Sequence, residues 1–281
     1  MLNTTLIREY LDNKLRRYPS IFIEALFMTI VSIILSQLLY YEESGIVSLF
    51  FLSILLRQRM KDILAQNRIA IFEKKSSSTK ANINTTFQFI VIFSAIFFIY
   101  SFSSFLLPKE FTSYLFKKQL SICQINPENI LIQNFGQFNY IAMHNLIVLL
   151  LVMMFSFFFQ YFGAIFVLGL NASIWGVVLS LIIQNTISQN SFNPFLFFLC
   201  AFVSIIPHLL MEAGAYVLGS LSAIFISKAF IKYPVASNIF NRVIWASIKM
   251  ALLAVIIIIL SAIVETTIPS FFINHFFSKF A

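Results

Sequence analysis

The residues whose chemistry stands out are a proline, a histidine and a glutamate within the otherwise apolar segment 206–220, IPHLLMEAGAYVLGS. Pro207 and His208 are adjacent, and Glu212 follows the histidine by four positions, so a helix places the imidazole and the carboxyl on one face. Such a pair can share a hydrogen bond or hold a cation. In a bilayer a proline and two titratable groups inside one apolar segment are costly, and they mark where function should be sought.

Hydrolytic motifs are absent from the sequence. A zinc metalloprotease would need HExxH and a rhomboid-type serine protease GxSG, and the EExxxR pattern of membrane prenyl-endopeptidases is not met by Glu42 and Glu43. We therefore expect no enzymatic activity, no cofactor and no metal site. The alternative role for His208 and Glu212 is structural, as a buried pair that satisfies itself and holds helices together.

Other polar residues lie within or at the ends of further apolar segments. Glu265 closes the last segment, Asn145 stands at the start of another, and Asn171 lies inside a third. Their structural roles would be a carboxylate at a helix end and amides that join helices. The topology predicted below puts Asn145, His208, Glu212 and Glu265 toward one leaflet, so their polar atoms should converge within about 10 Å. The candidate functional residues are Asn145, Asn171, Pro207, His208, Glu212 and Glu265.

The elements that must position these residues are membrane helices. Of the 281 residues, 59% are hydrophobic and 11% are charged, with a mean hydropathy of +0.89; soluble domains carry about 25% charged residues. Apolar runs of roughly 20 residues, long enough to cross a bilayer, recur along the chain. This predicts an all-α, polytopic transmembrane helix bundle. Two cysteines exclude a disulfide framework, and the net charge of +8 reflects loop bias rather than nucleic-acid binding.

The apolar runs divide the chain into spans and two regions. A hairpin is expected from 20–41 and the short run 46–56, which can cross if the polar stretch after it continues the helix out of the membrane. The run 140–183 must hold two spans, with a turn at Gln160-Tyr161. The other expected spans are 87–107, 209–227 and 243–264. Residues 1–80 would comprise a basic segment, the hairpin and a basic linker, and 81–281 the transmembrane core.

Lys and Arg counts predict the orientation. With the N-terminus in the cytoplasm, 14 of the 19 basic residues fall in the cytoplasmic segments 1–19, 57–80 and 228–242, and three in the outer loop 108–140. We therefore expect a multi-pass protein of the cell membrane. Because the chain must then cross once between Asn190 and Lys232, residues 194–206 are predicted to form a short re-entrant half-helix, which makes seven crossings. The alternative is one kinked, strongly tilted helix through Pro207.

At these residues the chain resembles the stage II sporulation protein M family. The family pattern has an Asn at the head of one span, NG with a further Gly, PHGxxE followed by a Gly, and a last span that ends in Glu before a Pro. The matching residues here, over about residues 85–270, are Asn145, Asn171 with Gly176, Pro207-His208 with Glu212 and Gly219, and Glu265 with Pro269. Two positions depart from the pattern, because Ala172 and Leu209 stand where the family has Gly. The N-terminal hairpin looks like that of archaeal members.

The resemblance implies a membrane core with a polar cluster, built to hold partners or to move a substrate. In the bacteria that named the family, a member holds cell-wall-degrading partners, but a sporulation role is not carried over here. We expect a membrane scaffold or assembly factor; the alternative is a permease or transport subunit that uses His208, Glu212 and Glu265. A dry cluster favours the scaffold, and a hydrophilic cavity that reaches Glu212 favours transport. Candidate partners are the lipid bilayer, membrane or extracytoplasmic proteins and a second copy of the chain, with no nucleic acid.

Overall fold

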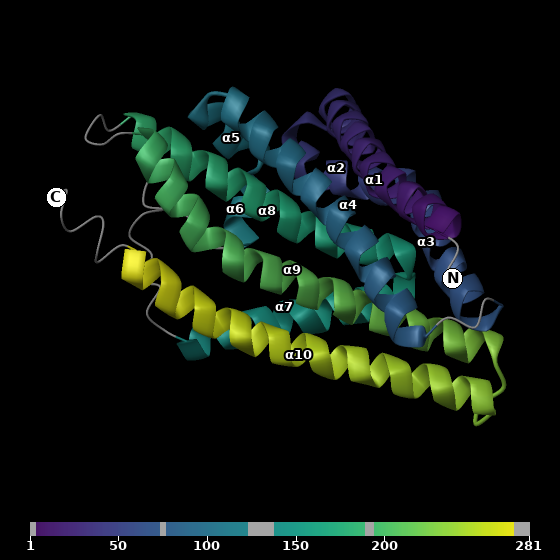
Figure 1. The fold of residues 1–281 in the computed structure, drawn as a ribbon. Helices are drawn as coiled ribbons and strands as arrows, with labels where there is room; N and C mark the ends of the chain where they lie inside the picture. Colours follow the sequence, from purple (N-terminus) through teal and green to yellow (C-terminus); the bar gives the residue numbers. More distant parts are fainter. Residues whose placement is uncertain (1–3, 74–76, 123–137, 189–193, 273–281) are drawn as a thin grey trace.

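The protein is a bundle of long helices in a computed structural model that describes residues 4–73, 77–122, 138–188 and 194–272 (Figure 1). Six helices are long and apolar enough to cross a membrane. This confirms the prediction of an all-α, polytopic membrane bundle. The elements are α1 (Thr4–Leu39), the 3₁₀ turn η1 (Tyr41–Glu43), α2 (Ser44–Leu55), α3 (Arg57–Phe72), α4 (Ser78–Leu106), α5 (Lys109–Leu115), α6 (Lys117–Ile122), α7 (Phe138–Phe159), α8 (Tyr161–Ser188), α9 (Pro194–Lys232) and α10 (Asn238–Phe272).

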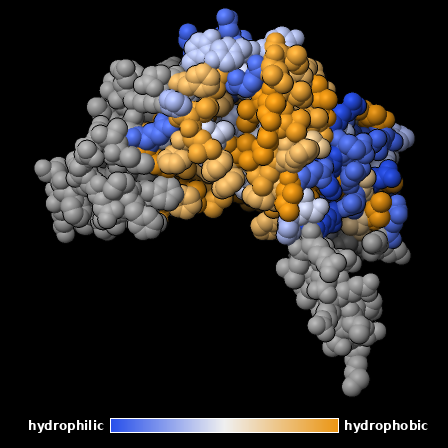
Figure 2. All heavy atoms as spheres, turned by 90° about the horizontal axis from the view of Figure 1, so that it is seen from above, coloured by the Kyte–Doolittle hydropathy of each residue, from blue (hydrophilic) through white to orange (hydrophobic). Residues whose placement is uncertain are grey.

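Helices α8 and α9 form the centre of the bundle. In their apolar stretches 72% and 67% of the residues are buried, against 22% for α7 and 33% for α10. Helix α9 packs most extensively on α10 and also on α7, while α8 packs mainly on α4. Hydrophobic side chains cover a broad band across the middle of the face in Figure 2, and hydrophilic ones gather at its right-hand end. The exposed apolar helix faces therefore suit contact with lipid.

The N-terminal hairpin consists of α1 and α2, and α3 continues from α2 after a bend at Leu56. Leu52, Leu56 and Met60 are fully buried at helical spacing, so one apolar stripe runs across the bend. The Arg59 side chain donates to the Glu24 carboxylate and ties α3 to α1. Helix α2 has 12 residues, which is short for a helix that crosses a bilayer upright. The short apolar run 46–56 predicts this length.

The turn between α7 and α8 lies where the sequence predicts it. Gln160 alone separates the two helices, with a φ of 49° in the left-handed region. Helix α8 then starts so close to the end of α7 that a Cβ on Gly163 would stand 2.1 Å from the Phe155 carbonyl oxygen. Glycine at 163 is therefore what permits this tight reversal.

The prediction of a separate re-entrant half-helix is wrong. Residues 194–206 belong to α9, one helix that continues through Pro207 to Lys232. A proline removes one backbone hydrogen bond and bends a helix, but packing on both sides can hold the helix together. Here Ser261 of α10 donates to the His208 carbonyl at 3.0 Å, directly after the proline. The structure agrees instead with the alternative, one helix through Pro207. The expected number of crossings does not change, because both predictions have the chain cross once between Asn190 and Lys232.

Helix ends also differ from the expected spans. Helix α4 begins at Ser78, inside the stretch expected as linker, and the expected loop 108–140 contains α5 and α6. Residues 123–137 of that loop lie outside the described residues. Helix α8 continues beyond residue 183, the expected end of its span. The Gln184 amide donates to carbonyl groups at the end of α4, those of Ser104, Phe105 and Leu107, at 3.1, 3.2 and 2.8 Å. The polar residue therefore caps a neighbouring helix.

Candidate functional site

The centre of the candidate site is a hydrogen bond between α7 and α9. The Asn145 side-chain amide donates to a Glu212 carboxyl oxygen at 2.5 Å. Both side chains are buried, with 6% and 3% of their surface exposed. The polar side chains of two separate helices therefore meet in the protein interior, where each is removed from lipid and from water.

Helix α10 adds a second carboxyl group. The side chains of Glu212 and Glu265 are hydrogen-bonded to each other, and Glu265 is 8% exposed. Two carboxyl groups can share a hydrogen bond only when one of them carries a proton. The pair can therefore hold one proton between α9 and α10. Because α10 continues to Phe272, Glu265 lies within the helix and does not close it, contrary to the sequence-based expectation.

Tyr216, one turn after Glu212, completes the surroundings of Asn145. Its hydroxyl donates to the Asn145 amide oxygen at 3.4 Å, while the amide nitrogen donates to Glu212. Both ends of the amide are thus engaged, which fixes its orientation. The group of Asn145, Glu212, Tyr216 and Glu265, called the carboxyl cluster below, joins α7, α9 and α10.

His208 lies one turn before Glu212 and is 1% exposed. Its imidazole packs edge-to-face against the indole of Trp175 on α8, with ring centroids 5.5 Å apart. Ser261 of α10 donates to its carbonyl oxygen. The turn from Pro207 to Glu212 is therefore in contact with α7, α8 and α10, which supports a fixed position for both side chains.

The side-chain hydrogen bond of Asn171 does not connect this residue to the carboxyl cluster. Its amide nitrogen donates to the Val167 carbonyl at 2.9 Å, within its own helix α8. The structure thus brings Asn145, Glu212 and Glu265 together, puts Pro207 and His208 one turn away on α9, and leaves the Asn171 bond within α8. Within the described ranges no three His, Cys, Asp or Glu side chains lie close enough together to hold a metal ion.

Three neighbours of the candidate residues were missed from the sequence. Tyr216 lies four residues after Glu212, and Ser261 four residues before Glu265, so helical spacing could have found both. Trp175 gave no such signal, because its contact with His208 depends on how α8 and α9 pack.

Comparison with known families gives a match on the region that holds these residues. The family model described as stage II sporulation protein M matches residues 83–270, more than half of the chain. The chain belongs to the stage II sporulation protein M family. The matched region agrees with the resemblance seen in the sequence, and it holds all six candidate residues but not α1 to α3. No curated protein and no solved structure matches the chain.

Packing accounts for Gly176 and for the two positions at which the chain departs from the family pattern. A Cβ on Gly176 would stand 2.9 Å from the Phe97 carbonyl oxygen, so this glycine lets α8 approach α4 closely. Ala172 and Leu209, the two departures from the family pattern, are 0% and 4% exposed. The interior therefore holds the additional side chains beside Asn171 and His208.

Proposed function

We propose that this member of the stage II sporulation protein M family is a membrane scaffold or assembly factor without catalytic activity. The observation that supports the proposal is the closed carboxyl cluster, whose polar groups bond to one another across α7, α9 and α10 and have little exposed surface. Groups satisfied in this way stabilise one arrangement of helices. A fixed bundle with apolar outer faces suits a protein that holds others in the membrane.

The proposal includes a location and an orientation. The chain is a multi-pass protein of the cell membrane with a cytoplasmic N-terminus and seven crossings, an orientation supported by the excess of Lys and Arg in segments 1–19, 57–80 and 228–242. Its partners are the bilayer, membrane or extracytoplasmic proteins and a second copy of the chain. The hairpin of α1 and α2, outside the matched region, is of the archaeal type.

One observation favours a second candidate function, a permease or transport subunit. Glu212 and Glu265 are two carboxyl groups that share a hydrogen bond inside a membrane bundle. Intramembrane carboxyl groups form proton relays in pumps and transporters. In this alternative, the proton held by the pair would leave and return as a substrate moves.

The test compares wild type, Glu212→Gln and Glu212→Ala. Glutamine can keep the hydrogen bonds of residue 212, whereas alanine leaves Asn145 and Glu265 without that partner. For a scaffold, Glu212→Gln should accumulate like wild type and co-purify from native membranes with the same proteins in the same ratio. Wild type in proteoliposomes should not dissipate a pH gradient faster than protein-free vesicles do.

The opposite result would favour transport. Gradient dissipation by wild type that is abolished in an equally abundant Glu212→Gln variant contradicts the scaffold proposal. Leu210→Ala is the matched control, since this neighbouring α9 side chain is 51% exposed. It should behave as wild type in both assays.

A further inference from the structure

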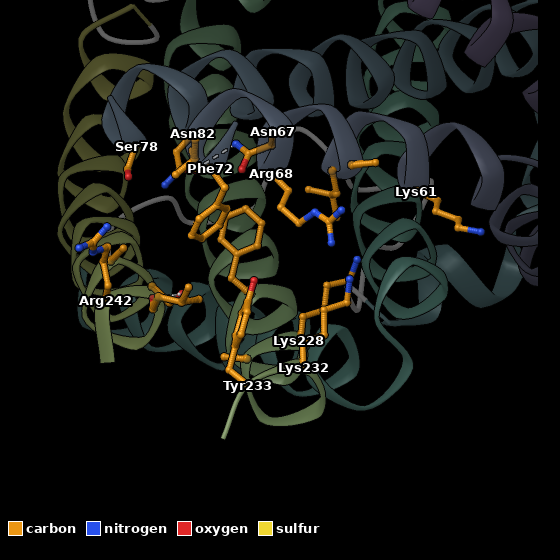
Figure 3. Close-up of a pocket in the computed structure, with 18 of the residues that line it drawn as sticks. Lys61, Asn67, Arg68, Phe72, Ser78, Asn82, Lys228, Lys232, Tyr233 and Arg242 are labelled. Atoms are coloured by element: carbon orange, nitrogen blue, oxygen red, sulfur yellow. Dashed lines mark hydrogen bonds between the residues drawn. The ribbon is translucent and has the colours of Figure 1, made fainter. Parts of the chain in front are cut away.

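A cavity of about 240 Å³ lies at the end of the bundle opposite α5 and α6. Five helices line it: α3, the first turn of α4, the first residue of α8, the end of α9 and the first turns of α10 (Figure 3). Along α9, Glu212 and Lys228 are separated by 16 residues, or about 24 Å. The cavity is therefore distinct from the carboxyl cluster.

Positive charge dominates the lining of this cavity. The lining includes five basic side chains and no acidic one: Lys61, Arg68, Lys228, Lys232 and Arg242. In the part of the chain that the structure describes, none of the five forms a salt bridge. Lys232, Arg68 and Lys61 lie near enough to Lys228 for their charges to act on it. Like charges gathered without a counter-charge repel one another, and an anion in the cavity would relieve that repulsion.

The helices present these charges in an ordered way. Lys61, Arg68 and Phe72 share one face of α3, while the other face is buried in the core through Met60 and Ile63. Lys228 and Lys232 are one turn apart on α9 and lie on the same side of the cavity in Figure 3. The basic face of α3 is therefore turned toward the basic end of α9.

Lys228 is held in place rather than extended into solvent. It is half-buried, its ammonium group donates to the Tyr161 hydroxyl, and its nitrogen lies 4.3 Å from the centre of that ring. Tyr161 is also the first residue of α8, whose N-terminal amide groups favour an anion nearby. A fixed ammonium group beside a helix start is an arrangement that binds phosphate groups.

We propose that this cavity binds the phosphate group of an anionic ligand. The apolar and aromatic lining residues Leu64, Ile71, Phe72, Phe225 and Tyr233 suit the attached organic part, which an anionic phospholipid or a soluble phosphate ester could supply. The proposal does not depend on the scaffold function, because the cavity and the carboxyl cluster share no residue.

The test measures binding to the purified full-length protein in neutral detergent. The probes are phosphatidylglycerol, phosphatidylcholine and sn-glycerol 3-phosphate, with retained ligand counted by native mass spectrometry and dissociation constants obtained by titration. Arg68→Gln and Lys232→Gln should each weaken binding about fivefold, since one basic residue near an anionic headgroup contributes ~1 kcal/mol. Arg68→Lys should retain most of the affinity, and added salt should reduce it.

Lys80→Gln is the matched control, because it removes one exposed positive charge at the same end of the bundle but outside the cavity lining. Binding of phosphatidylglycerol over phosphatidylcholine, without binding of glycerol 3-phosphate, identifies a lipid headgroup as the ligand. Binding of glycerol 3-phosphate with the same dependence on Arg68 identifies a soluble phosphate ester. Failure of both anionic probes to bind, or equal weakening by Lys80→Gln and Arg68→Gln, overturns the proposal.

Discussion

Removal of the Glu212 side chain should destabilise the bundle far more than removal of its charge. The Glu212 carboxyl group accepts from Asn145 and is hydrogen-bonded to Glu265. In Glu212→Gln, the new amide oxygen can accept from Asn145 and the amide nitrogen can donate to Glu265. In Glu212→Ala, the Asn145 amide and the Glu265 carboxyl lose this partner where little water can replace it.

The size of the effect follows from the groups left behind. A buried polar group without a partner costs about 1–3 kcal/mol in soluble proteins, and single interhelical hydrogen bonds in membranes contribute roughly 0.6–1.7 kcal/mol. Two such losses predict that Glu212→Ala lowers the free energy of unfolding by about 2–4 kcal/mol. Glu212→Gln should lower it by less than about 1 kcal/mol.

The assay is reversible unfolding in mixed micelles, with Leu210→Ala as the control for truncation of an α9 side chain. A double-mutant cycle with Asn145→Ala isolates the bond between Asn145 and Glu212, and the coupling free energy should be about 1 kcal/mol. Equal destabilisation by Glu212→Gln and Glu212→Ala would refute the reasoning, because the charge and not the hydrogen bonds would then determine stability. Additive effects of Asn145→Ala and Glu212→Ala would show that the two side chains do not interact.

Two further predictions concern the turn after α7 and the topology. Gly163→Ala should lower the free energy of unfolding by about 1–3 kcal/mol, because the new Cβ would collide with a backbone carbonyl. Gly214→Ala should leave it unchanged or raise it, because a Cβ there has nothing within 4 Å. Equal unfolding midpoints for the two variants would contradict this reasoning. With seven crossings, a reporter inserted in the loop 233–237 should be cytoplasmic and one fused after Ala281 extracytoplasmic. A cytoplasmic C-terminal reporter would contradict a crossing by α2.

The sequence predicts the fold class, most of the spans and three of the four residues in the carboxyl cluster, the exception being Tyr216. The spans were predictable because apolar length determines what can cross a bilayer. Asn145, Glu212 and Glu265 could be singled out because polar groups in such segments need partners, and three groups at similar depth can supply them to one another. The turn at Gln160 was recognisable because Gln160-Tyr161, followed by Gly163, lies near the middle of an apolar run long enough for two spans.

The continuity of α9 was not predictable from local sequence. Pro207 breaks the local pattern, but contacts from α10 and α8 at His208 stabilise the turn that follows it. Such contacts join residues more than 30 positions apart in sequence. For the same reason the span was expected to end at residue 183, although Gln184 lies within α8 and donates to the end of α4.

The basic cavity shows what the counts of Lys and Arg in the loops do not predict, which is the direction in which those side chains face. Lys61 and Arg68 lie in one basic segment, and Lys228 and Lys232 in another, and both segments count toward the same prediction of orientation. Whether those charges face solvent, acidic partners or one another depends on the side of α3 that packs against the core. Because Met60 and Ile63 are buried, the basic face of α3 is turned toward the end of α9, and the charges that indicate orientation are gathered around one cavity.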